Sequence, residues 1–123
     1  RRRHTRYISV TGVQTCALPI CHLYIHNDPG TATCLELATG KELWTERLTG
    51  GSASGQNWSS VLLADGKCYT ITQGGDCFVF KASPSFELQA TNPLGERSNS
   101  SVAASQGALF IRTHKSLWCV QTP

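Results

Sequence analysis

Cysteine and histidine are the residues of this chain with the widest chemical capacity, because both bind metals and a thiolate can act as a nucleophile. The chain holds six cysteines and four histidines in 123 residues. No two cysteines form a C-x-x-C pair, and none stands at zinc-ligand spacing from a histidine, so the spacing predicts no metal site. We expect the strand cysteines to be buried free thiols that pack as small hydrophobic side chains. These are Cys34, Cys68, Cys77 and Cys119.

The histidines and aspartates are the remaining candidates for acid–base chemistry. His22, His26 and His114 have no serine or cysteine partner at motif spacing, which predicts solvated or capping roles. The aspartates stand in glycine-containing turns, where this residue commonly satisfies its own backbone. They are Asp28, Asp65 and Asp76. The sequence therefore predicts no catalytic, cofactor-binding or metal-binding residue in this chain.

The charge of the chain is concentrated at its start. The formal net charge is +3, with eleven basic and eight acidic residues, but four of the basic residues lie within residues 1–6. The remaining seven are outnumbered by the acidic residues, and the basic stretch 112–115 has no accompanying aromatic stacking surface. We expect that stretch to be an exposed loop and predict no nucleic-acid partner. No apolar run approaches the length of a membrane span.

Residues 1–20 are set apart from the rest. Residues 10–20 resemble, codon for codon, the conceptual translation of a common sequencing-library adapter. The segment also lacks the continuous apolar core of a secretory signal. We therefore interpret residues 1–20 as an adapter-derived, disordered segment and exclude them from the reasoning on the fold, leaving residues 21–123.

The remaining sequence repeats itself with a period of 41 residues. Residues 59–72 align without a gap with residues 100–113, so that Gly66 lies over Gly107. A period of about 40–45 residues is typical of four-stranded propeller blades and longer than most helical or leucine-rich repeats. An earlier, partial copy places residues 23–25 in the position of residues 68–70.

Hairpin signals agree with an all-β fold. Residues 68–72 and 77–80 flank Gly74-Gly75, whose glycines permit a tight turn. Centring the turn on these glycines places Thr72 opposite Cys77, and that register keeps the hairpin cysteines too far apart for a disulfide. Apolar residues on both faces of 77–80 predict a strand covered on two sides.

The same register places Cys68 opposite Lys81. A second hairpin is predicted to bend at residues 38–41, between strands at 35–37 and 42–44. No segment of helical length has a convincing 3.6-residue periodicity, because Gly40 interrupts the best candidate.

Two segments resemble the repeats of quinoprotein-type (PQQ-like) β-propellers, in particular outer-membrane-assembly-lipoprotein-like members. Residues 34–44 carry an apolar strand, an Ala-Thr-Gly-Lys turn and a tryptophan, and residues 64–69 carry an Asp-Gly-x-x-Tyr hairpin. The likeness covers about residues 22–120, and the order and spacing of the motifs are more specific than either motif alone.

The family pattern implies roles for several residues in docking one blade onto the next. The repeat tryptophan of the family packs between neighbouring blades over the glycine-containing turn, which implies this role for Trp44 and Gly40. The second copy has Phe86 in place of the tryptophan, and we expect Phe86 to fill a similar slot less completely. The further expected blade-docking residues are Tyr69, Phe110 and Trp118.

The resemblance implies a partial β-propeller of about two to three four-stranded antiparallel blades. Residues 21–123 would form C-terminal blades of a seven- or eight-bladed ring whose N-terminal blades are missing. An isolated arc of this kind leaves two open blade faces, so the missing blades of the same chain are expected partners.

The function implied by the resemblance is that of a non-catalytic scaffold, which binds a protein partner in the bacterial periplasm or outside the cell. The alternative is a C-terminal fragment of a PQQ-dependent quinoprotein dehydrogenase. Such an enzyme would show an adjacent cysteine pair, and none occurs here. We therefore expect no enzyme activity and no cofactor in this chain. A third hypothesis is an appendage of a larger signalling protein.

Overall fold

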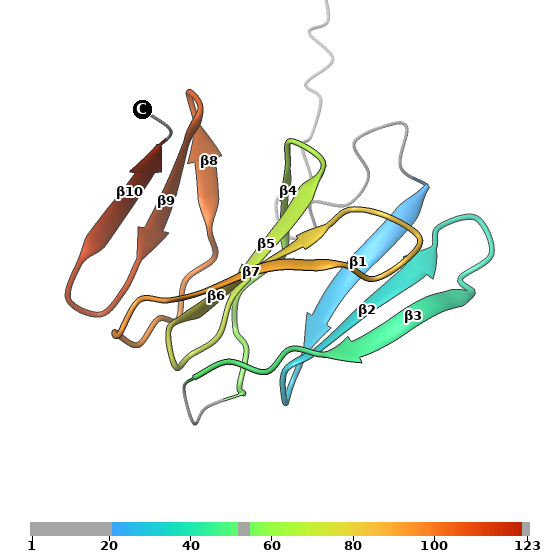
Figure 1. The fold of residues 1–123 in the computed structure, drawn as a ribbon, viewed down its shortest axis with the longest axis horizontal. Coiled ribbons are helices and arrows are strands. Elements are labelled where there is room, and N and C mark those ends of the chain that lie inside the picture. The colour runs from blue at the N-terminus through green and yellow to red at the C-terminus, as the bar shows by residue number, and fades with distance from the viewer. Residues whose placement is uncertain (1–20, 52–54, 122–123) are drawn as a thin grey trace, which may run out of the picture.

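The computed structural model describes residues 21–51 and 55–121, and these residues form three small antiparallel sheets (Figure 1). The predicted adapter-derived segment, residues 1–20, lies outside the described residues. The first sheet has the order β1-β2-β3, the second β4-β5-β6-β7 and the third β10-β9-β8. Since all elements of the described chain are strands, the all-β expectation is confirmed. Four strands were predicted for each sheet, and the second sheet alone has four in the described ranges.

The strand bounds follow the predicted hairpins. They are β1 (His22–Asn27), β2 (Thr31–Glu36), β3 (Glu42–Arg47), β4 (Leu62–Ala64), β5 (Lys67–Ile71), β6 (Asp76–Lys81), β7 (Leu88–Pro93), β8 (Ala103–Ser105), β9 (Ala108–Arg112) and β10 (Leu117–Gln121). Within the described part of the chain, no helix could cross a membrane.

The 41-residue repeat is confirmed in three dimensions by two matching turns. Asp65 and Gly66 join β4 to β5 with φ of 49° and 68°, and Gln106 and Gly107 join β8 to β9 with φ of 50° and 78°. Positive φ at both central residues characterises the type I′ turn, whose twist suits two-residue hairpins. Gly66 and Gly107 adopt this conformation without a Cβ penalty, and each turn sits at the same place in its sheet.

The chain leading into each of these sheets repeats as well. The hydroxyl group of Ser59 accepts a hydrogen bond from the Ile71 amide, at 3.1 Å. At the equivalent place 41 residues later, the Ser100 hydroxyl donates to the Arg112 carbonyl, at 2.6 Å. The repeated unit therefore includes the polar segment that precedes its first strand as well as the hairpin.

The predicted register of the β5–β6 hairpin is wrong by one residue. Ile71, rather than Thr72, lies opposite Cys77, and Lys67, rather than Cys68, lies opposite Lys81. The turn is longer than a two-residue loop, because the Thr72 amide donates to the Asp76 carbonyl at 3.0 Å and three residues lie between them. Within this turn only Gly75 has a positive φ, of 93°.

The first and second sheets share a cross-strand pattern. Tyr24, Cys34 and Trp44 lie side by side on β1, β2 and β3. In the second sheet the corresponding row on β5, β6 and β7 is Tyr69, Val79 and Ala90. A β-bulge follows the middle residue of each row, so the two rows occupy equivalent positions.

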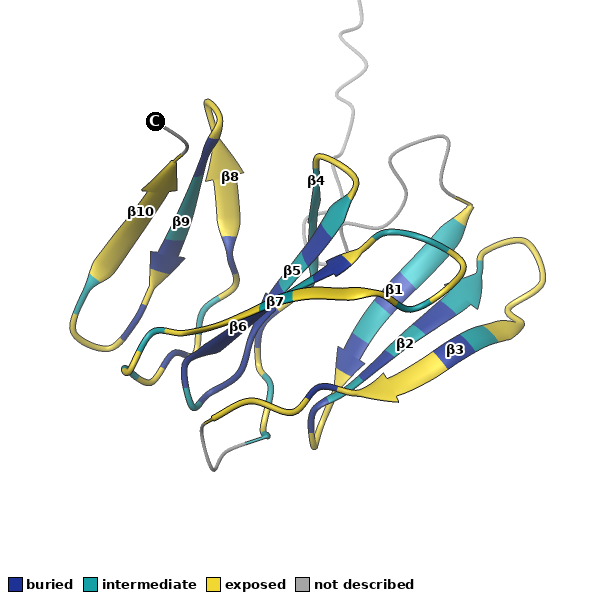
Figure 2. Cartoon of the chain, in the orientation of Figure 1, coloured by how far each residue is buried: buried dark blue, intermediate teal, exposed yellow. Residues whose placement is uncertain are grey.

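The core consists of two clusters, one on each face of the second sheet. In that sheet the buried residues are concentrated on β5 and β6 (Figure 2). Because successive side chains of a strand point to opposite faces, Phe78 and Phe80 pack toward the first sheet while Cys77 packs toward the third. This confirms that the strand at 77–80 is covered on two sides. The three sheets therefore pack face to face in sequence order, with the second sheet in the middle.

Candidate functional site

The contact between the first and second sheets is an aromatic cluster built around Trp44. The Trp44 ring is buried, and its centroid lies 5.0 Å from that of Phe86 and 5.8 Å from that of Phe80, to which it is nearly perpendicular. Tyr24 completes the cluster, 6.1 Å from Trp44. Offset and edge-to-face arrangements at these separations are the favoured ones for aromatic rings. The cluster therefore joins the two sheets with specific geometry as well as buried area.

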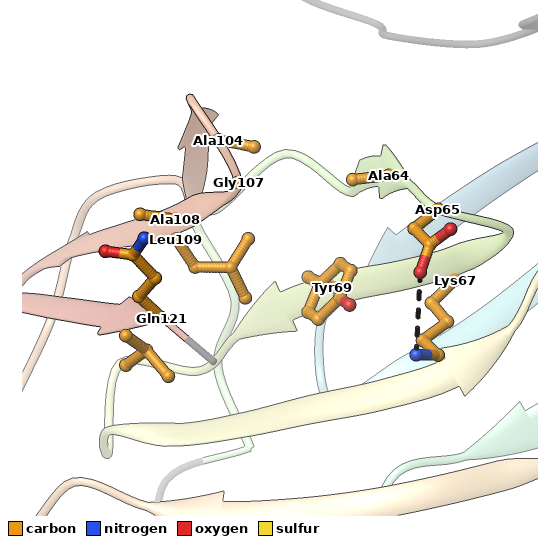
Figure 3. A pocket seen from close by; sticks show the side chains of 10 residues that line it. Ala64, Asp65, Lys67, Tyr69, Ala104, Gly107, Ala108, Leu109 and Gln121 are labelled. Carbon is orange, nitrogen blue, oxygen red and sulfur yellow. Dashed lines mark ion pairs between the residues drawn. The ribbon is translucent and has the colours of Figure 1, made fainter. Parts of the chain in front are cut away.

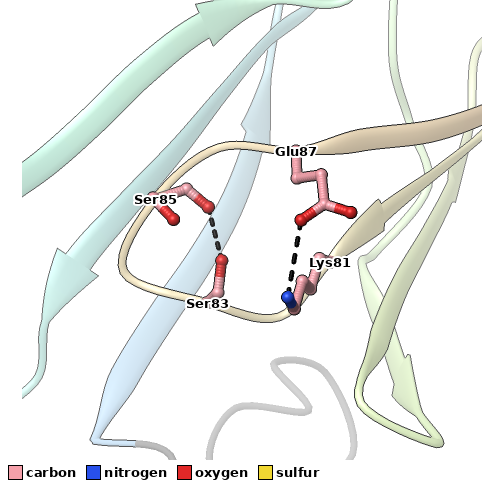
Figure 4. A network of polar contacts seen from close by, with 4 residues as sticks. All are labelled: Lys81, Ser83, Ser85 and Glu87. Carbon is pink, nitrogen blue, oxygen red and sulfur yellow. Dashed lines mark hydrogen bonds and ion pairs between the residues drawn. The ribbon is translucent and has the colours of Figure 1, made fainter.

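A short loop between β6 and β7 receives the polar end of Trp44. The indole Nε1 donates to the Ser83 carbonyl at 3.2 Å. The loop is held by a hydrogen bond from the Ser83 hydroxyl to the Ser85 carbonyl and by the Lys81–Glu87 ion pair at its base, at 3.4 Å (Figure 4). Trp44 is thus anchored at both its apolar and its polar ends.

A buried polar network also joins the first and second sheets, away from the aromatic cluster. His26 Nδ1 lies 2.8 Å from the Thr70 hydroxyl, which lies 2.9 Å from the Ser59 hydroxyl. Ser59 in turn donates to the Asn57 side chain at 2.9 Å. The expectation of a solvated or capping role for His26 is wrong, because its side chain is buried between the sheets.

Burial has a direct effect on the acid–base chemistry of His26. Removal from water lowers the pKa of this imidazole to about 4, and the Asp28 carboxylate opposes the shift without cancelling it. The Nε2 atom is buried and finds no hydrogen-bond partner among the described residues. Burial therefore favours the neutral ring, in which Nε2 carries no buried, unpaired N–H.

The thiols of the clusters are inert rather than reactive. Cys34, Cys68 and Cys77 are free and buried, as predicted, whereas Cys119 is free but exposed, contrary to the prediction. Burial raises the pKa of Cys68 to about 12 and that of Cys77 to about 11. A thiol that stays protonated is a poor nucleophile and a poor metal ligand.

The contact between the second and third sheets is less well filled. Its buried apolar residues are Ile71, Cys77, Val102 and Ile111. Beside them lies a cavity of about 490 Å³ that is open to solvent on one side, and a second hollow of about 440 Å³ adjoins it near the type I′ turns. Figure 3 shows the latter, with Tyr69 from the second sheet and Leu109 from the third on its walls.

The three residues expected to dock the first blade onto the second differ in what they contact. They are Trp44, Phe86 and Gly40. Phe86 contacts Trp44 itself, within the same cluster, so it does not repeat the Trp44 position in the next interface. The cross-strand register gives that position to Ala90. Gly40 has a φ of 72°, which fits the predicted turn, but a Cβ added there would meet no ring within 4 Å from more distant described residues.

Of the other three predicted docking residues, Trp118 and Phe110 lie on opposite faces of the third sheet, and Tyr69 packs toward that sheet from the second. Tyr69 packs against the cluster between the second and third sheets, and Trp118 lines the cavity there while remaining 37% exposed. Phe110 occupies the same place in β9 as Tyr69 in β5, on the opposite face from Ile111. Tyr69 and Phe110 are both half-buried and on corresponding strands, as the repeat predicts.

The end of the third sheet is fixed by a carboxylate. Glu96 accepts hydrogen bonds from the Thr113 and Ser116 hydroxyls, the latter at 3.0 Å, and these bonds hold its pKa below the ordinary value. The Glu96 carbonyl lies so close to Gly75 that a Cβ added there would meet it at 2.0 Å. Arg112, His114 and Lys115 are exposed, as predicted, but the expectation of an exposed loop over 112–115 is wrong in part, because Arg112 ends β9 and Thr113 is buried.

Sequence reasoning missed the polar network of His26, Thr70, Ser59 and Asn57. One signal was present, because the equivalent polar residues Ser98 and Ser100 stand 41 residues after Asn57 and Ser59. Of the aspartates predicted in turns, Asp28 accepts from the Asn57 amide and Asp65 lies in a turn, whereas Asp76 is buried at the start of β6.

Three or more His, Cys, Asp or Glu side chains do not come together within residues 21–51 and 55–121 in a way that could hold a metal ion. Comparison with known proteins adds no family: no protein-family model matches the chain, and no curated protein sequence matches it.

Proposed function

We propose that this chain contributes blades to a β-propeller-type repeat protein that serves as a scaffold for binding another protein. The observation that carries the proposal is the 41-residue period, which recurs as matching hairpins of two neighbouring sheets. Sheets repeated at about this period and stacked face to face are typical of propeller blades. A periplasmic or extracellular location is part of the proposal and is supported by the family resemblance alone.

A surface suited to a protein partner lies on the loop between the first two sheets. Trp58 is 65% exposed, although its neighbours are tightly held. The Asn57 side-chain amide donates to the carbonyls of His26 and Ser59, each at 3.0 Å. A large aromatic side chain presented on a fixed backbone has little conformational entropy to lose on binding, and tryptophan is enriched at the energetic centres of protein interfaces.

The proposal is tested by identifying the partner and then measuring its affinity with purified proteins. The full chain is immobilised, bound proteins from an extract of the source organism are identified, and the best candidate is titrated by calorimetry. Trp58→Ala is expected to weaken binding by at least about tenfold, the equivalent of roughly 1.4 kcal/mol.

Leu37→Ala serves as the matched control, because Leu37 is also a large exposed hydrophobic residue, at 51%, on a different loop. It is expected to leave the affinity unchanged. Equal losses in both variants would contradict a contact centred on Trp58, and the absence of any saturable protein partner would contradict the scaffold function.

A further inference from the structure

The position filled by Trp44 between the first two sheets is vacant between the second and third. Trp44 and Ala90 are equivalent in the cross-strand rows described above, because each lies beside the middle residue of its row and next to the same β-bulge. An alanine in place of an indole removes most of the side-chain volume at this point. The neighbouring space is the cavity of about 490 Å³ between the second and third sheets, and Ala90 lines it.

The walls of this cavity are suited to an uncharged aromatic group. Tyr69, Val79 and Ala90 line it from the second sheet, and Ile111 and Trp118 line it from the third. Its volume lies within the range of about 300–1,000 Å³ found for small-molecule sites.

The polar groups of the lining do not call for a charged ligand. Lys67 lies 3.9 Å from the Asp65 carboxylate, and the Cys77 thiol is kept protonated by burial. Gln89 and Asn92 add side-chain amides, which can pair with a single ring N–H or hydroxyl group. In the filled interface the indole N–H of Trp44 likewise makes one hydrogen bond, to the Ser83 carbonyl.

We propose that the cavity between the second and third sheets binds a small, neutral, planar aromatic molecule of one or two fused rings, in the position that corresponds to the Trp44 indole. The ligand would contact Tyr69 on one side and Trp118 on the other. Trp118 is 37% exposed, and a bound ring beside it would remove further apolar surface from water. This site is separate from the protein-binding surface at Trp58, so either proposal can fail without the other.

The test uses the full chain and 5-fluoroindole as the probe, observed by ¹⁹F NMR. A saturable shift with a dissociation constant of about 1 mM or lower is expected, together with displacement by unlabelled indole. Intermolecular NOEs from the probe to the methyl groups of Val79 and Ile111 are expected in the unsubstituted chain. Absence of saturation, or NOEs to other parts of the surface, would overturn the proposal.

Ala90→Trp supplies the position with its own indole and is expected to abolish binding of the probe. Ala103→Trp is the matched control, because Ala103 is exposed on β8 and pairs with Phe110, on the face of the third sheet directed away from the cavity. The control is expected to bind as the unsubstituted chain does. If Ala90→Trp folded and still bound the probe with unchanged affinity, the proposed position would be wrong.

Discussion

Replacing Trp44 by alanine removes a ring at the centre of the interface between the first and second sheets. The ring is 8% exposed and contacts three other aromatic rings. Truncating a buried tryptophan to alanine costs about 3–5 kcal/mol. Loss of the hydrogen bond to Ser83 is included in this cost at about 1 kcal/mol. We therefore expect a loss of about 4 kcal/mol in the free energy of unfolding.

This loss is a large part of the stability of a small domain, which is typically about 5–15 kcal/mol. Urea unfolding followed by far-ultraviolet circular dichroism measures it, with the slope m compared between variants so that a change of midpoint can be read as a change of stability. Trp44→Phe keeps a ring and loses the indole N–H, so its loss should be smaller, at about 1–2 kcal/mol. Trp58→Ala removes an exposed tryptophan and should change stability by less than about 0.5 kcal/mol. Equal losses for Trp44→Ala and Trp58→Ala would refute the docking role of Trp44.

Two further predictions concern the backbone and the acid–base behaviour of the fold. Gly75→Ala should destabilise the protein far more than Gly40→Ala. Both glycines have positive φ, but of the two only Gly75 would bring its added Cβ against backbone, 2.0 Å from the Glu96 carbonyl oxygen. Similar melting temperatures for the two variants would argue against this packing of the turn. Burial lowers the His26 pKa from 6.5 to about 4, so the unfolded chain binds more protons between these values and stability should fall by up to about 3 kcal/mol as the pH decreases through that window. Unfolding midpoints measured from pH 7 to 4 should show this loss of stability in the unsubstituted chain but not in His26→Gln. The control is His114→Gln, which changes an exposed histidine and should behave as the unsubstituted chain does. The same pH dependence in all three proteins would disprove the prediction.

The elements that local chemistry determines could be predicted from the sequence. The Asp65-Gly66 and Gln106-Gly107 turns are separated by one repeat length, and positive φ follows from the residue type at Asp65, Gly66 and Gly107 but not at Gln106. Apolar residues on both faces of β6 indicated the two-sided burial of Phe78 and Cys77. The absence of a disulfide between Cys68 and Cys77 could be predicted from their separation in the hairpin, which stays wide in the observed register.

The features that depend on tertiary packing could not be predicted in this way. The number of residues in the turn before Asp76 sets the register, and two adjacent glycines are compatible with either a two- or a three-residue loop. A hydrogen bond between the Thr72 amide and the Asp76 carbonyl selects the longer one. As a result, the residue opposite Cys77 is Ile71 rather than the predicted Thr72.

The candidate site shows the same division. Trp44 was identified from its motif, but its contact with Phe86 and the equivalence of Trp44 with Ala90 depend on how the sheets pair and bulge. An alanine carries no sequence signal of an unfilled position. The burial of His26 depends on Thr70, which lies 44 residues away in another sheet, and no local pattern links the two.

The central claim is that consecutive β-sheets of this chain stack face to face through side chains at equivalent positions. Aromatic and methyl NOE spectra of the full chain test it directly. We predict NOEs from the Trp44 ring to Phe80 and Phe86, and from Ile71 to Ile111, across the two sheet interfaces. Spectra in which Trp44 shows contacts only to its own sheet, while Ile71 and Ile111 show none to each other, would contradict the account.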